Sequence, residues 1–162
     1  MLYLRKLRNY IYKKTSLRSG LRSTILLSSL VLIPCSSTHS YAEEIAVVVN
    51  ATNRISTITP EELRAIFMAQ RFTFGDGSEA IVVNLGRKNP VKNDFYKKAT
   101  GLSAKKIKRK WAAAAFSGQT EFPEEFKTAP ALISWIKENK NTIGYLAIED
   151  VTSDVKVIML LP

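Results

Sequence analysis

The sequence predicts an α/β fold in which helices pack on a mixed sheet, and three observations lead to that fold class. Short apolar runs rich in β-branched residues alternate along the chain with segments whose apolar residues recur at helical spacing. Most of the helical segments open with a residue that suits an N-cap. Residues 43–162 amount to one domain's worth of chain, and strands that alternate with helices are typical of α/β proteins.

The first 42 residues predict a secretory signal peptide. They carry seven basic side chains and no acidic one, then the apolar run 24–33, then Ser40-Tyr41-Ala42, which suits cleavage after Ala42. The apolar run is about half as long as a membrane span requires, so we expect no permanent span. Cys35 leaves a lipid anchor as the alternative, although Pro34 stands where a lipobox needs a small residue. We expect residues 43–162 to be a single exported domain, periplasmic or secreted.

Four segments have the composition of buried strands. The first, residues 45–49, is a β-branched run that ends at the turn sequence Asn50 to Asn53. The second, residues 80–83, follows the turn Gly75-Asp76-Gly77. Residues 143–147 and 155–159 close the chain.

Four helices are expected between these strands, starting at residues 60, 90, 104 and 130. The first has Thr59 as its N-cap, Pro60 at N1 and Glu62 in a capping box. The second and third end at the glycines Gly101 and Gly118. The fourth runs to about residue 140, after a segment with Pro123 that we expect to be a polar loop.

The basic residues concentrate in one part of the chain. Residues 43–162 carry 17 basic and 14 acidic side chains, but residues 86–118 alone hold ten basic residues against Asp94. The basic side chains are either the solvated face of two helices, a surface for an anionic partner, or part of an anion pocket. The export signal argues against a nucleic-acid partner. The candidate partner surface comprises Lys97, Lys98, Lys105, Lys106, Arg109 and Lys110.

The residue inventory argues against an enzyme. Without the first 42 residues the chain has no Cys and no His, which removes thiol chemistry, His-based triads and Cys/His metal sites. Its paired carboxylates, such as Glu61 and Glu62, are adjacent in sequence, so their side chains diverge instead of converging across a cleft. No phosphate-binding glycine loop or catalytic motif occurs. We therefore expect no catalytic residues, no metal and no cofactor.

Loops that follow strands are the better candidates for a binding site, because ligands of α/β proteins bind beyond strand ends and near helix N-termini. Each candidate has a second reading as a cap or turn residue. The candidate ligand-binding residues are Asn50, Asn53, Arg87, Lys88, Asn89, Ser117, Gly118 and Thr120.

Several short motifs resemble, in order and spacing, the substrate-binding proteins of phosphate ABC transporters, a family with the periplasmic-binding-protein fold. The resemblance covers nearly all of residues 45–160. The matching motifs are Val47-Val48-Val49-Asn50, residues 59–67, Gly75-Asp76-Gly77, Val82-Val83, Phe95-Tyr96, Trp111, Phe116-Ser117-Gly118 and residues 141–145.

The resemblance implies a three-layer α/β/α sandwich, similar to one lobe of a type II periplasmic binding protein, and a binding role for a small oxyanion such as phosphate. A transporter or a sensor in the membrane would be the partner. In that family an Arg and then Ser-Gly-Thr at a helix start cradle the anion; here Asn89-Pro90-Val91 stand in the Ser-Gly-Thr place. The alternative is a non-enzymatic envelope interaction module that reuses the lobe and docks a partner through its basic helices.

Overall fold

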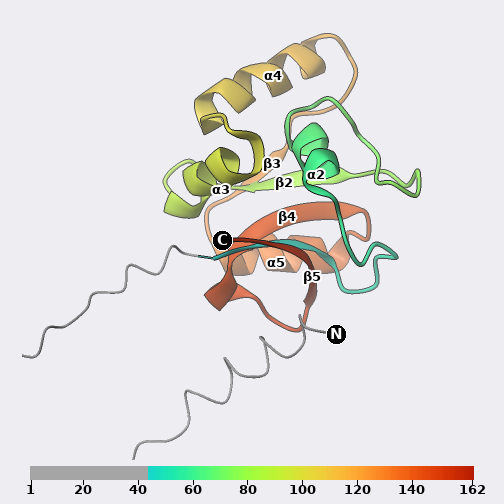
Figure 1. Cartoon of the computed structure of the whole chain (residues 1–162), viewed down its shortest axis with the longest axis vertical. Helices are drawn as coiled ribbons and strands as arrows, with labels where there is room; N and C mark the ends of the chain where they lie inside the picture. The colour runs from blue at the N-terminus through green and yellow to red at the C-terminus, as the bar shows by residue number, and fades with distance from the viewer. Residues whose placement is uncertain (1–43) are drawn as a thin grey trace, which may run out of the picture. The chain divides into compact units, whose positions relative to one another are not determined.

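The computed structural model describes residues 44–162, so the predicted signal peptide and its cleavage site lie outside the described residues (Figure 1). The strands are β1 (Ile45–Asn50), β2 (Ile81–Leu85), β3 (Glu124–Phe126), β4 (Thr142–Ala147) and β5 (Val155–Leu161). The helices are α2 (Pro60–Phe67), α3 (Pro90–Thr100), α4 (Ala104–Phe116) and α5 (Ala129–Glu138), and a 3-10 turn, η1 (Ile148–Asp150), follows β4.

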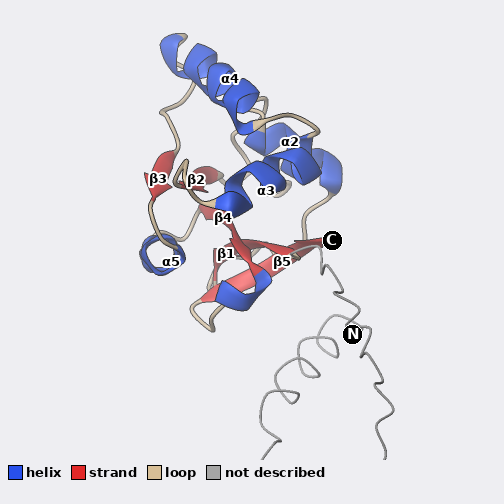
Figure 2. Ribbon diagram, turned by 90° about the vertical axis from the view of Figure 1, so that its left-hand side faces the viewer, coloured by secondary structure: helices blue, strands red, loops and turns tan. Residues whose placement is uncertain are grey.

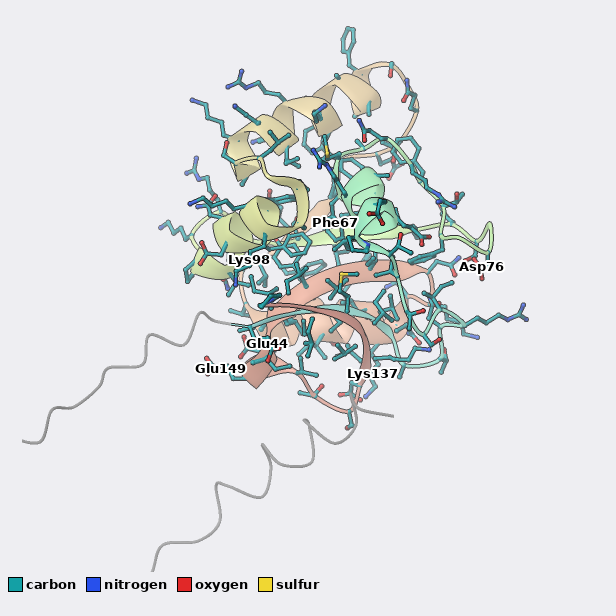
Figure 3. The ribbon with its side chains drawn as sticks, in the orientation of Figure 1. Glu44, Phe67, Asp76, Lys98, Lys137 and Glu149 are labelled. Atoms are coloured by element: carbon teal, nitrogen blue, oxygen red, sulfur yellow. The ribbon has the colours of Figure 1, made fainter. Side chains whose placement is uncertain are left out.

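The five strands form one mixed sheet in the order β3-β2-β4-β1-β5. β2 is parallel to β3 and β4, whereas β1 runs antiparallel to both of its neighbours, β4 and β5. Four strands therefore end on the same side of the sheet, and β1 ends on the opposite side. The side where the four strands end is called the carboxyl end of β2, and the opposite side is called the amino end of β2. In Figure 3 Glu149 lies at the carboxyl end of β2, and Asp76 lies at its amino end. The predicted mixed sheet is confirmed.

Helices cover both faces of the sheet, which confirms the three-layer α/β/α sandwich (Figure 2). α2 and α3 pack on one face and α5 on the other. Gly144 of β4 faces α5: a Cβ there would lie 3.0 Å from Val83 Cγ2 and 3.1 Å from Ile136 Cδ1. Only a residue without a side chain lets α5 approach β4 so closely.

A cluster of buried aromatic rings joins α2 and α3 to the sheet. The ring of Phe95 stacks on that of Tyr145, with centroids 3.8 Å apart and planes within 6°. Phe67, which extends from α2 toward the sheet (Figure 3), meets Phe95 edge to face at 4.6 Å. All three side chains are fully buried, so this cluster is the centre of the hydrophobic core.

A buried asparagine lies beside the aromatic cluster. Asn84 of β2 accepts a hydrogen bond at Oδ1 from the hydroxyl of Tyr96, at 2.6 Å, and another from that of Tyr145, at 3.2 Å. Burial raises the pKa of both phenols above the ordinary value. Both hydroxyls therefore stay protonated at neutral pH and act as donors to Asn84.

α4 lies outside the other helices on its face of the sheet and packs on α3 (Figure 2). Its inward side is a narrow strip, formed by Ile107, Trp111 and Ala114. The indole Nε1 of Trp111 donates to the carbonyl of Phe67 at 3.0 Å, which fixes α4 to the end of α2. Most of the remaining surface of α4 faces solvent.

The main difference from the predicted elements is β3. The segment expected to be a polar loop contains this three-residue strand, which pairs with the second half of β2. β2 itself runs to Leu85, two residues beyond the predicted strand, and α5 ends at Glu138. Within residues 44–162 no helix is both long and apolar enough to cross a membrane.

Candidate functional site

Three of the candidate residues lie together at the carboxyl end of β2. Arg87 and Lys88 occupy the turn between β2 and α3, and both side chains are exposed. Asn89 is the N-cap of α3: its Oδ1 accepts from the backbone N–H of Val91 at 3.0 Å. Because Pro90 has no N–H and that of Val91 is already bound, the first turn of α3 offers few free donors to an anion.

A third cation, which the sequence analysis did not select, lies beside this turn. The backbone of β3 and the start of α5 run next to Gly86, where a Cβ would lie 3.5 Å from Cα of Lys127. The N–H of Gly86 also donates to the carbonyl of Phe126 at 2.7 Å. Arg87, Lys88 and the exposed Lys127 therefore share one end of the sheet, where α3 and α5 both begin.

The fourth cation of this region is already neutralised. Lys92, in the first half of α3, is buried and forms an ion pair with Glu125 of β3 at 2.7 Å. This pair joins α3 to the edge strand. Neither Arg87 nor Lys88 has such a partner among the described residues, so their charges remain available to a ligand.

Asn50 and Asn53 lie at the amino end of β2, away from Arg87, because β1 is antiparallel to the strands around it. The side-chain amide of Asn50 donates to the carbonyls of Ile136 and Lys137, both at 2.8 Å, and thereby caps the end of α5. That of Asn53 donates to the carbonyl of Lys140 at 2.8 Å. The structure therefore does not bring these two residues together with Arg87 and Asn89: Asn50 fixes the end of α5, and Asn53 fixes the loop that follows α5.

Ser117, Gly118 and Thr120 form a third location, after α4. The hydroxyl of Ser117 donates to the carbonyl of Ala114 at 3.0 Å and ends the helix, and Gly118 has the left-handed φ of 72°. Gly118 and Thr120 line a groove of about 720 Å³ beside β2. The charged residues that line it are glutamates, so this location does not favour an anion.

All six residues of the candidate partner surface are exposed. Lys97 and Lys98 are on α3, and the other members are on α4. Helical geometry places Lys105, Arg109 and Phe116 within about 40° of one another, on the side of α4 opposite its buried strip. Phe116 is 97% exposed. No cation of α4 is in an ion pair with another described residue.

No protein-family model and no curated protein sequence matches the chain. The fold is similar to solved structures of phosphate-binding proteins. One is a phosphate ABC transporter substrate-binding protein from Clostridium perfringens with bound phosphate, at a TM-score of 0.58 and 16% identity over 70% of this chain and 43% of that one. Another is an ABC-type phosphate transport receptor from Vibrio cholerae, at a TM-score of 0.56 and 18% identity. The match covers 71% of this chain and 45% of that one. A third is PstS from Borrelia burgdorferi, at a TM-score of 0.53 and 10% identity. The match covers 70% of this chain and 46% of that one.

The comparisons define a class of fold. The chain has the mixed five-stranded sheet of a periplasmic-binding-protein lobe, and it spans less than half the length of the phosphate-binding proteins it matches. Identities of 10–18% establish the fold alone. Within residues 44–162 no group of three or more Asp, Glu, His or Cys side chains is arranged to hold a metal ion.

Proposed function

We propose that the chain is an exported, non-enzymatic solute-binding-like protein that holds a small oxyanion, such as phosphate, at the carboxyl end of β2. The observation that carries this proposal is the grouping of Arg87, Lys88 and Lys127 at the start of α3 and α5. Positive side chains beside two helix N-termini attract an anion by charge and by the helix dipoles. The structural neighbours are phosphate-binding proteins of transporters, so a membrane transporter or sensor is the partner that fits this function.

The local geometry also sets how the anion is held. The N–H of Val91 is bonded to Asn89, so the ligand depends on the guanidinium of Arg87 and the ammonium groups of Lys88 and Lys127. All three are exposed, and interactions between exposed charges are weakened by salt. Binding is therefore expected to be modest in affinity and to weaken as ionic strength rises.

Phosphate is expected to raise the midpoint of thermal unfolding at low ionic strength. A ligand at ten times its dissociation constant adds about 1.4 kcal/mol, which moves the midpoint by roughly 5 °C in a domain of this size. The double variant Arg87→Ala/Lys88→Ala should lose most of this shift. Lys105→Ala/Arg109→Ala on α4 removes the same charge and should keep it. Chloride at equal ionic strength is the salt control. If Arg87→Ala/Lys88→Ala keeps the phosphate-induced shift of the midpoint, the assigned site is wrong.

A second candidate function rests on α4. We propose that Lys105, Arg109 and their neighbours on α4, together with Lys97 and Lys98, dock an acidic protein surface. The exposed ring of Phe116 on the same side of α4 supports this proposal, because solvent-exposed aromatic side chains are enriched at protein interfaces.

Reversing charges on α4 tests the docking function. The variant Lys105→Glu/Arg109→Glu should lower affinity for the envelope partner of the wild-type chain at least about tenfold, because like charges then face each other. Its midpoint of thermal unfolding should remain unchanged, since both positions are exposed. Arg87→Glu/Lys88→Glu is the matched control and should still bind the partner. Co-purification that is equal for the wild type and the α4 variant would exclude this surface.

A further inference from the structure

A groove of about 720 Å³ lies beside β2, away from the proposed anion site. One wall is Ala80 with the first half of β2, and another is the segment that joins α4 to β3. β3 is too short to cover this half of β2, since its pairing begins at Val83. The volume is within the range of sites for small organic molecules.

Aromatic side chains from several elements line the groove. Trp111 comes from α4, on one face of the sheet, and Trp135 comes from α5, on the other face. Phe72 packs edge to face on Trp111, with centroids 6.1 Å apart, and Phe122 is 49% exposed at the rim. The indole Nε1 of Trp135 is buried without a hydrogen-bond partner among the described residues.

The charge of the groove is opposite to that of the proposed anion site. Its charged lining residues are Glu79, Glu121 and Glu124, and no Lys or Arg is among the residues that line it. These carboxylates are exposed, and within residues 44–162 they form no group that could hold a metal ion. Dispersed carboxylates beside aromatic faces suit a cation whose charge is spread over an organic group.

We propose that this groove binds a small organic ammonium ion. The glutamates attract the charge, and the rings of Trp135, Phe72 and Phe122 contact the carbon substituents and stabilise the cation through their π-faces. This site does not depend on the oxyanion function, because it shares no residue with Arg87, Lys88 or Lys127.

The two tryptophans make the proposal directly measurable. They are the only tryptophans of the chain and both line the groove, so a bound ligand changes the intrinsic tryptophan fluorescence of the full protein. The probes are choline and phenethylammonium, each compared with a neutral counterpart of similar shape, dimethylbutanol and phenethyl alcohol. A saturable change is expected with at least one ammonium ion, at a dissociation constant about tenfold or more below that of its neutral counterpart.

Variants then assign the binding to the groove. Glu79→Gln/Glu124→Gln should weaken binding of the ammonium ion about fivefold or more, whereas Glu138→Gln, an exposed glutamate at the end of α5, should leave it unchanged. The midpoint of thermal unfolding of each variant shows that the fold is retained. The proposal is overturned by the absence of a saturable change with either ammonium ion, by equal binding of the neutral compounds, or by full binding in the double variant.

Discussion

Phe95→Ala is expected to lower the free energy of unfolding by about 3–5 kcal/mol. The ring of Phe95 is fully buried, stacks on Tyr145 and meets Phe67 edge to face. Its removal leaves a cavity between α3 and the sheet and breaks both ring contacts.

The measurement is urea unfolding followed by circular dichroism, with Phe116→Ala as the matched control. Phe116 is 97% exposed, so the same substitution there should change the free energy of unfolding by less than about 0.5 kcal/mol. A loss of under about 1 kcal/mol for Phe95→Ala would show that the aromatic cluster is not the centre of the core.

Asn84→Ala is expected to cost about 2–4 kcal/mol, because it leaves two buried hydroxyl groups without an acceptor. The Oδ1 atom of Asn84 receives the hydrogen bonds of Tyr96 and Tyr145, and all three side chains are buried. Both hydroxyls keep their proton at neutral pH, because burial raises the pKa of both phenols, so each still needs a hydrogen-bond acceptor in the variant. Unfolding in urea at neutral pH measures the effect.

A mutant cycle separates this hydrogen-bond loss from simple loss of packing. The background Tyr96→Phe/Tyr145→Phe lacks both hydroxyl groups that Asn84 accepts from. In that background Asn84→Ala should therefore lower the free energy of unfolding by less. We expect a coupling energy of at least about 1 kcal/mol. An equal cost in both backgrounds would mean that Asn84 contributes through packing alone.

Much of the fold follows from local sequence. The caps Thr59 and Asn89 bind the N–H groups of Glu62 and Val91, at 3.1 and 3.0 Å, and these two helices begin where the capping residues predict. Gly101 ends α3 with a left-handed φ of 72°, again as expected. The apolar run of β1 is buried along its whole length. In each case the residue types within a few positions are enough to predict the local element.

β3 could not be predicted in this way. It has three residues, Glu124 to Phe126, and the two glutamates are exposed at the edge of the sheet. So short a segment has neither a β-branched run nor a clear alternation of apolar and polar side chains. It is a strand because β2 provides a backbone partner and Lys92 pairs with Glu125, and both partners are distant in sequence.

The spatial grouping of the candidate residues could be predicted only in part, for a related reason. Local sequence identifies a strand but not its direction, so it could not place Asn50 and Asn53 at the end of the sheet opposite Arg87. Lys127 was missed because only the pairing of β3 with β2 brings it next to Gly86. Arg87 and Lys88 could be placed together because they stand between a strand end and a helix start within four residues, and their role in binding an anion stays a prediction.

The antiparallel placement of β1 has a consequence for how the chain folds. Ile45 is paired with Ala147 on one side and with Leu161 on the other, so both neighbours of the first strand are the last two strands to be synthesised. Contacts that are so distant in sequence close slowly, because a long loop must be ordered before they form. Until then β1 exposes an apolar segment with two unpaired edges, which is the kind of surface that aggregates or recruits chaperones. The domain is therefore expected to complete its sheet only after synthesis has passed β5.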